Sequence, residues 1–210
     1  MKTKQSGFTL VEIAIVLVII GLLLGGILKG QEMIIQAKVK NSITDFSGVS
    51  AAYFGYQDRY RAIPGDDIGT DRWGAAVPKG NGDRNLAGLY APAAVTDESA
   101  LWWDHLRRSG FVTGSGVANP LNSFAGILGV ETGDGAAGTA LGGFTNLILC
   151  SSNLPDKVAI ALDVQMDDGN PGSGAVRGVL VAGTPATISA TAAVSYAETG
   201  TNTYTLCRQF

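Results

Sequence analysis

An almost uninterrupted apolar run, Phe8 to Leu28, follows a short leader that carries two lysines. As an α-helix with a rise of about 1.5 Å per residue, this run spans about 31 Å, which matches the thickness of a bilayer core. It contains one carboxylate, Glu12, and an ionisable group inside a membrane helix is costly and by default functional. The pattern therefore predicts a membrane-spanning helix in which Glu12 has a partner.

After Leu28 the chain changes to an amphipathic pattern in which apolar residues recur every three or four positions. The members of this stripe are Val39, Ile43, Phe46, Val49, Tyr53, Tyr56 and Tyr60. Such spacing predicts a helix with one buried face. No proline interrupts residues 8–61, so we predict one continuous helix that ends at Ile63-Pro64-Gly65.

We predict an α+β head for the remaining residues, 62–210. The head is expected to be rich in loops, because most of the 29 glycines of the chain follow Gly65. Thr96 to Ser99 reads as the capped start of a short helix that ends at Gly110. Antiparallel strands are predicted at residues 147–150, 158–164, 176–181 and 204–208. We expect residues 167–172 to form the hairpin connection between two of these strands, and the small sheet to pack on the long helix.

The N-terminal segment resembles the precursors of type IV pilins and pseudopilins. These proteins carry a short positive leader that ends in Gly, then Phe, then an apolar helix with Glu four residues after the Phe. Met1 to Gly7, Phe8 and Glu12 match this pattern position by position, and the resemblance extends to about Tyr60. It implies that a prepilin peptidase cuts between Gly7 and Phe8 and methylates the new amine of Phe8. Many of these proteins have a proline late in the apolar helix, where this chain has glycines at positions 21, 25 and 26.

The resemblance also implies an organisation and a location. Residues 1–7 are the leader, 8–28 the membrane and filament-core helix, 29–61 its amphipathic continuation, and 62–210 the head. The precursor is expected in the inner membrane with an extracytoplasmic head, and the assembled form in an extracellular pilus or a periplasmic pseudopilus. Expected partners are other pilin subunits in a homo-oligomeric filament, the prepilin peptidase and the inner-membrane assembly platform.

The resulting hypothesis is a structural subunit of a type IV pilus or a pilus-like filament. Two alternatives stay open: a pseudopilin of a type II secretion system, and a minor or tip subunit with a ligand-binding or adhesive head. An ordinary signal peptide is disfavoured because its apolar region is typically about 7–15 residues long and ends at a small-residue cleavage site. This run is longer and has no Ala-x-Ala after it.

The partner of Glu12 can be sought within the chain itself. Burial in an apolar bundle costs several kcal/mol unless a cation compensates the charge. The nearest cation after cleavage is the amine of Phe8, which a neighbouring subunit staggered by about one helical turn would bring to Glu12. Such a pair would fix the register between subunits. The alternative is that Glu12 extends to the membrane surface, about 6 Å away along the helix.

Charge and motifs disfavour other classes of function. The chain has 15 basic and 18 acidic residues and a formal charge of −3, whereas nucleic-acid binding relies on clustered Lys and Arg. No nucleophile elbow, zinc-protease motif or nucleotide loop is present. His105 is the only histidine and has no identifiable nucleophile partner, so we read it as a helix-face residue. We therefore predict neither an enzyme nor a nucleic-acid-binding protein.

The two cysteines, Cys150 and Cys207, both lie late in the chain. An extracytoplasmic head permits them to pair, and a bridge across a loop of this length stabilises by about 4 kcal/mol in the chain-entropy model. It would hold the C-terminal segment against the strand near Leu147, as many pilins do with a C-terminal disulfide. Two buried free thiols are the alternative.

Two acidic segments raise the question of calcium, although no other cofactor is expected. The first has oxygen ligands at alternate positions, as in the first half of a calcium loop: Asn81, Asp83 and Asn85. An EF-hand would need Gly and Glu where this chain has Leu86 and Pro92, so only an irregular site remains open. The second segment offers Asp163, Asp167 and Asp168. Turn formation by Asp and Asn is the commoner explanation for both.

Overall fold

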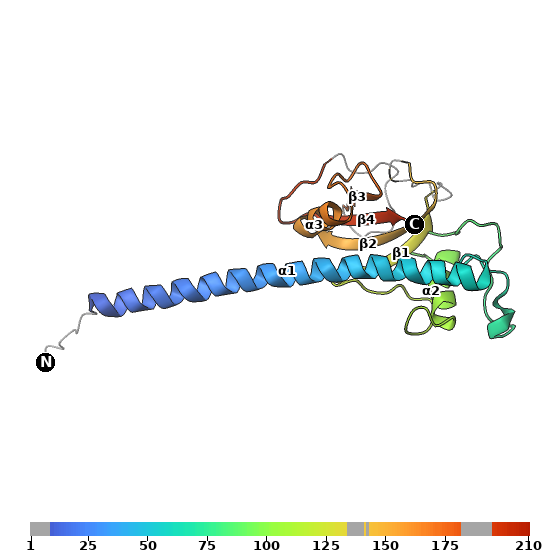
Figure 1. The fold of residues 1–210 in the computed structure, drawn as a ribbon, viewed down its shortest axis with the longest axis horizontal. Coiled ribbons are helices and arrows are strands. Elements are labelled where there is room, and N and C mark those ends of the chain that lie inside the picture. Colours follow the sequence, from blue (N-terminus) through green and yellow to red (C-terminus); the bar gives the residue numbers. More distant parts are fainter. Residues whose placement is uncertain (1–8, 134–140, 142, 182–194) are drawn as a thin grey trace. The chain divides into compact units, whose positions relative to one another are not determined.

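The computed structural model describes residues 9–133, 141, 143–181 and 195–210 (Figure 1). Its elements in chain order are α1 (Leu10–Tyr60), a 3-10 turn η1 (Thr70–Trp73), α2 (Glu98–Arg108), β1 (Leu128–Thr132), β2 (Leu147–Pro155), α3 (Asp156–Met166), β3 (Val176–Leu180) and β4 (Thr203–Gln209). The chain divides into two compact units, Met1–Lys38 and Val39–Phe210. The predicted α+β class, with a long N-terminal helix and a small antiparallel sheet, is confirmed.

In the first unit, the described part of α1 leaves its large apolar side chains exposed, with Leu10 at 90% and Leu22 at 73%. This helix has a mean hydropathy of 2.8 over an 18-residue window, none of which is buried. By length and composition it is long and apolar enough to cross a membrane. So large a continuous apolar surface needs lipid or other protein to cover it.

In the second unit, α1 supplies one buried stripe to the core of the head. Its buried residues are Val39, Ser42, Phe46, Val49, Ala52, Tyr53 and Tyr56. Most of them recur at intervals of three and four residues, so they fall on one face of the helix. The predicted stripe is therefore confirmed, with Ile43 and Tyr60 only half-buried and the small Ser42 and Ala52 completing the face.

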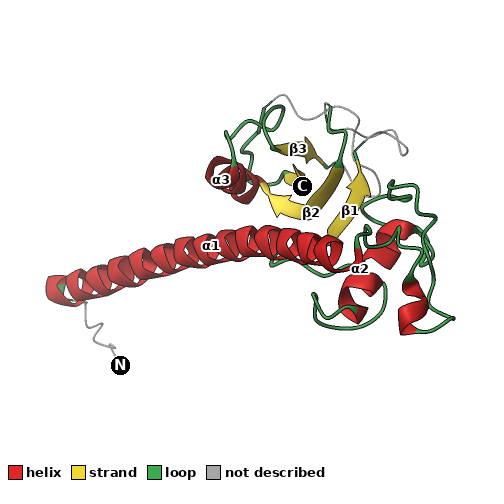
Figure 2. Ribbon diagram, turned by 45° about the vertical axis from the view of Figure 1, so that its right-hand side comes forward, coloured by secondary structure: helices red, strands yellow, loops and turns green. Residues whose placement is uncertain are grey.

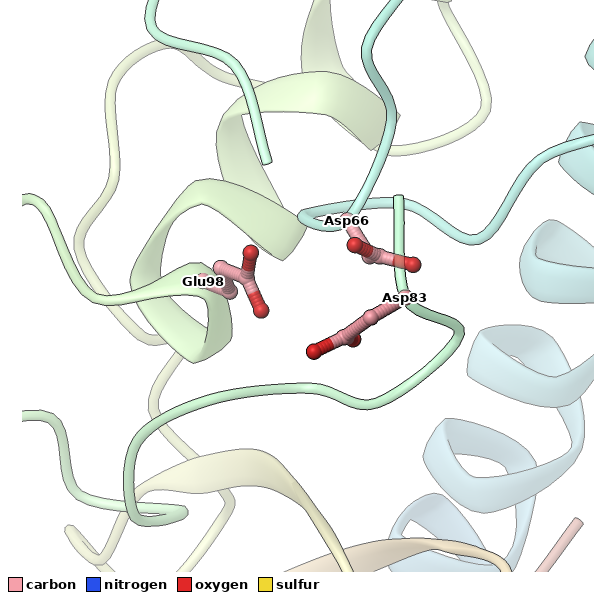
Figure 3. A group of neighbouring side chains, drawn as sticks. All are labelled: Asp66, Asp83 and Glu98. Carbon is pink, nitrogen blue, oxygen red and sulfur yellow. The ribbon is translucent and has the colours of Figure 1, made fainter. Parts of the chain in front are cut away.

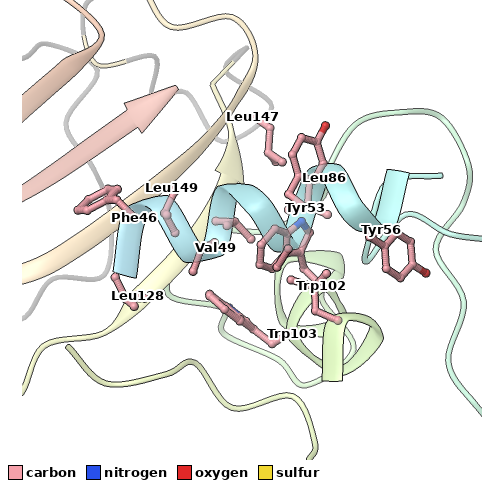
Figure 4. Close-up of a cluster of buried hydrophobic side chains, with 13 residues drawn as sticks. Phe46, Val49, Tyr53, Tyr56, Leu86, Trp102, Trp103, Leu128, Leu147 and Leu149 are labelled. Carbon is pink, nitrogen blue, oxygen red and sulfur yellow. The ribbon is translucent and has the colours of Figure 1, made fainter. Parts of the chain in front are cut away.

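The sheet is fully antiparallel, with strand order β1-β2-β4-β3. Side chains from β1 and β2 meet those of α1 and α2 in the main core: Phe46, Val49, Tyr53, Tyr56, Leu86, Trp102, Trp103, Leu128, Leu147 and Leu149 (Figure 4). Trp102 and Trp103 are completely buried, and their rings lie edge to face with centroids 4.8 Å apart. The predicted short helix at residues 97–110 is therefore confirmed as α2, and it carries the largest side chains of the core.

The strand predicted at Val158 to Val164 is wrong, because residues 156–166 form the helix α3 (Figure 2). The run Val-Ala-Ile-Ala-Leu fits a period of two, but its buried members, Val158, Ala159 and Leu162, also share one helical face. Asp156 lies in the first turn of α3, where the helix dipole favours a negative charge.

The structure differs from the sequence-based prediction at two further places. Residues 167–172 link α3 to β3, so the predicted hairpin between two strands is wrong as well. The strand β1 was not predicted; it has only five residues, lies in glycine-rich surroundings and pairs with β2. The sequence of so short a run indicates little about its conformation. Whether it forms a strand depends on the neighbouring strand with which it pairs.

The end of the chain is fixed by the pairing of β4 with β2. Cys150 and Cys207 are directly opposite in this register, and the structure joins them by a disulfide that is fully buried. Phe210 also holds this segment in place. Its N–H donates to the carbonyl of Leu147 at 3.1 Å, and the centroid of its ring lies 4.8 Å from that of Tyr53.

We expect Cys207→Ser to lower the free energy of unfolding of the head. The bridge spans 57 residues, and a loop of that length is worth about 4 kcal/mol in the chain-entropy model. Thermal melting with and without reductant checks this, with the double variant Cys150→Ser/Cys207→Ser as control for a buried unpaired thiol. Rapid alkylation of both cysteines in the native, unreduced protein would contradict the bridge.

Another buried group, His105, fixes the chain that follows α1. Its side chain is completely buried; Nδ1 accepts the backbone N–H of Gly65 at 2.9 Å, and Nε2 lies 3.1 Å from the carbonyl oxygen of Pro78. These partners require a neutral imidazole with its proton on Nε2. His105 is therefore a structural residue. It connects α2 to Gly65, which lies between α1 and η1, and to Pro78, which follows η1.

Burial lowers the pKa of His105 below its usual value, against the opposing effects of the Pro78 carbonyl and of the nearby Asp67 and Asp104 charges. The positive charge of Arg72 lowers it further. The folded head then binds a proton less readily than the unfolded chain, so stability is full above the unfolded pKa of about 6.5 and falls as the pH drops through the lowered folded value.

We predict that His105→Gln removes much of this pH dependence, because an amide can replace both hydrogen bonds without titrating. The measurement compares the melting temperature of wild type and variant at about pH 7.5 and about pH 5, on either side of the ordinary histidine pKa. An equal loss of stability in both proteins on acidification would assign the effect to the carboxylates instead.

Candidate functional site

The N-terminal residues are the first candidate site. Gly7 and Phe8, the predicted cleavage and methylation positions, lie outside the described residues. Glu12 lies in the first turn of α1, directly after the described residues Thr9, Leu10 and Val11. The geometry of this site therefore rests on Thr9 and Glu12.

Thr9 and Glu12 bond to each other in both directions at the start of α1. The N–H and the hydroxyl of Thr9 each donate to Oε2 of Glu12 at 2.8 Å, and the N–H of Glu12 lies 3.3 Å from the Thr9 hydroxyl oxygen. This is the reciprocal arrangement of a capping box, which satisfies N–H groups left without partners at a helix start. Sequence reasoning missed Thr9, although the pattern Thr-x-x-Glu signals such a box.

The box holds the Glu12 carboxylate but leaves its negative charge without a cation. Both contacts of Oε2 come from neutral groups of Thr9, and no described residue donates a hydrogen bond to Oε1. None of the described cations lies within ion-pair distance of Glu12. The site therefore presents a fixed, exposed oxygen that can accept a bond from a positively charged group.

Three carboxylates converge in the first acidic segment of the head (Figure 3). Ligand atoms of Asp66, Asp83 and Glu98 lie within 4.8 Å of one another. Asp83 was predicted here, but Asp66 and Glu98 come from distant parts of the chain and carry no local signal. The predicted Asn81 and Asn85 are not members of this group.

Backbone N–H groups already occupy most of these oxygens. Asp66 accepts from Gly82 at 2.5 Å and from Arg84 at 2.7 Å, and Glu98 accepts from Asn81 at 2.9 Å and from Ala87 at 2.8 Å. Burial raises the pKa of Glu98, although these N–H groups oppose the shift, and the charges of Asp66 and Asp83 raise it further.

The second acidic segment is brought together as predicted, with ligand atoms of Asp163, Asp167 and Asp168 within 4.8 Å. Asp163 is completely buried and accepts the Tyr196 hydroxyl at 2.6 Å. Asp167 accepts the N–H of Val176, and Asp168 accepts the hydroxyl of Ser173 and the N–H of Asn170. Burial raises the pKa of Asp163 despite its bond to Tyr196. Both segments are organised by bonds that fix turns.

Calcium binding at these segments is the open alternative to turn formation, and a melting experiment separates the two. Because the oxygens already accept N–H and O–H groups, we expect the melting temperature of the head to be the same in about 1 mM calcium and in a chelator. A higher melting temperature in calcium would show the opposite. Its loss in Asp83→Asn would assign the ion to the first segment, and its loss in Asp168→Asn to the second.

His105 was the one side chain that the sequence analysis weighed as a general base. His105 is bonded at both ring nitrogens to the protein backbone, so neither nitrogen can act as a base on a substrate without breaking the fold.

Comparison with known proteins gives one match, and it falls on the N-terminal site. Residues 2–28 match the family model described as the prokaryotic N-terminal methylation motif. No curated protein matches the chain, and neither does any solved structure. The match covers the leader, Thr9, Glu12 and the apolar run, and supports the type IV pilin and pseudopilin family that the sequence pattern resembles.

Proposed function

We propose that this chain, whose N-terminal segment supports membership of the type IV pilin and pseudopilin family, is a structural subunit of a type IV pilus or a pilus-like filament. The observation that carries the proposal is the methylation motif at residues 2–28, which includes the apolar start of α1, a helix whose most hydrophobic 18-residue window is not buried. Such a helix is suited first to lipid and then to the apolar core of an assembly.

Processing makes the subunit competent for assembly. The motif implies cleavage by a prepilin peptidase, for which we propose the bond between Gly7 and Phe8, followed by methylation of the Phe8 amine. The precursor would be a single-pass inner-membrane protein with its head outside the cytoplasm, delivered to the filament by an assembly platform. The same mechanism serves a surface pilus and a secretion pseudopilus, which differ in whether the filament leaves the cell.

Glu12 would set the register between subunits. The capping box fixes its carboxylate at the helix start, and Oε1 accepts no hydrogen bond from a described residue. The methylated amine of Phe8 in a neighbour staggered by about one turn would supply the cation. A charge buried in the filament core without that partner would cost roughly 3–5 kcal/mol at each contact, so the pair would select one stagger over others.

We predict that Glu12→Gln abolishes homopolymer filaments. Glutamine can keep the capping box with Thr9 but removes the charge, so the loss would be electrostatic rather than a weakened helix start. Thr9→Val is the matched control, because it breaks the box, at a cost of about 1 kcal/mol, and keeps the charge. It should still assemble.

The measurement is filament yield by shear fractionation and electron microscopy, normalised to the processed subunit in membranes. Mass spectrometry should show a methylated Phe8 at the start of all three proteins. Normal filaments from Glu12→Gln would refute the pairing mechanism. A wild-type protein that starts at Met1, or that enters no filament, would refute the proposed function itself.

A further inference from the structure

A half-buried carboxylate, Asp45, lies on α1 in the head and has no partner among the residues that the structure describes. Among the described residues none donates a hydrogen bond to Asp45 or lies within ion-pair distance of it. Burial raises its pKa, with no compensating cation nearby. A partly desolvated charge of this kind is unfavourable in an isolated subunit, and any contact that supplies a cation would be stabilised by it.

Asp45 lines a cavity of about 320 Å³ between α1 and residues 121–123, with Asn41, Thr44, Leu121, Asn122 and Ser123. The amide of Asn122 is used internally, since it bonds to the backbone and to Ser151. Leu121 is 72% exposed and offers an apolar wall. We refer to this cavity as the Asp45 pocket.

The pocket has the chemistry that a guanidinium group requires. A carboxylate and the oxygens of Asn41 and Ser123 supply acceptors, and the exposed Leu121 can cover the methylene stem of a long side chain. Arginine presents five donors in one plane and can bond several such oxygens at once. Lysine is a compact, strongly hydrated point charge and matches this set less well.

Arg84 is the matching group on the same chain. It is the one exposed arginine of the described residues for which the structure shows no side-chain hydrogen bond, ion pair or ring contact. Its backbone has a positive φ of 69°, which is uncommon for a residue other than glycine.

Asp66 fixes this conformation. Its buried carboxylate accepts the N–H of Arg84 at 2.7 Å and that of Gly82 at 2.5 Å. The Arg84 side chain is therefore presented from an ordered position, which lowers the entropy lost when it docks.

We propose that in the filament Arg84 of one copy enters the Asp45 pocket of the next copy. The inference rests on the proposed function, because it needs copies of this chain side by side. In a filament this contact would be heterologous, because each copy would offer its Asp45 pocket to one neighbour and its Arg84 to another, whereas a two-fold dimer would pair both surfaces of the same two copies. The Glu12 contact has the same symmetry, and the two would fix the register at the helix start and in the head.

Charge reversal tests the pair directly. Asp45→Arg and Arg84→Asp should each lower filament yield by at least about tenfold, because leaving a desolvated charge unpaired weakens a contact by more than that factor. The double variant Asp45→Arg/Arg84→Asp should restore most of the yield. Asp tolerates a positive φ better than most residues, so Arg84→Asp should not unfold the loop.

The matched controls are Asp58→Arg and Arg61→Asp. These two residues have the same chemistry, lie at the end of α1 and are more than 80% exposed, with 3.9 Å between their charged atoms. Both lie outside the Asp45 pocket and should leave the yield unchanged; Asp58→Arg is the stricter control, because Arg61 lines a pocket together with Arg84. Melting temperatures of all variants in detergent should match that of wild type, which separates assembly from folding.

Cross-linking gives an independent measurement. In Asp45→Cys/Arg84→Cys filaments, mild oxidation should produce a ladder of covalently linked copies, whereas either single variant should give none. The native cysteines are already joined within each head and do not contribute. Suppose that the wild type forms filaments, the double cysteine variant gives no ladder and charge reversal leaves the yield unchanged. Those results together would overturn this inference and leave the proposed function standing. Absence of wild-type filaments would overturn the proposed function with it.

Discussion

The head depends on the buried stripe of α1, which begins at Val39 and continues to Tyr56. This face gives the glycine-rich head a long apolar surface on which its other elements pack. Trp102 and Trp103 from α2 and Leu149 from β2 pack in the same cluster. A sheet of four short strands is marginal alone, and burying one of its faces against a helix is what makes it stable.

The first half of the same helix has the opposite property. It is apolar on all sides and buries none of its most hydrophobic window, so its stability must come from lipid or from other subunits. Thr9 and Glu12 close its start with a capping box and leave one charge uncompensated. Each half of α1 thus carries one carboxylate that has no cationic partner among the described residues, Glu12 in the first half and Asp45 in the second.

The contrast between confirmed and wrong predictions has a physical cause. Long periodic segments were predicted correctly because many residues contribute to one pattern, as in α1. Short segments were not: Val158 to Val164 fits both periods, and in the structure this segment belongs to the helix α3. The acidic group was only partly foreseen, because Asp66 and Glu98 reach Asp83 through the tertiary fold.

Local residue patterns were enough to predict the long helix, its change from apolar to amphipathic character, the N-terminal methylation motif and the position of Glu12 inside the apolar run. Each of these features depends on residues that are consecutive or periodically spaced in the sequence, so the local spacing is enough to predict it. Three properties became visible in the folded chain alone: His105 bonds to backbone groups at both ring nitrogens, Cys150 and Cys207 are opposite in register, and Asp45 has no partner among the described residues. Those properties depend on which distant segments meet, and burial and hydrogen-bond satisfaction are settled only when they do.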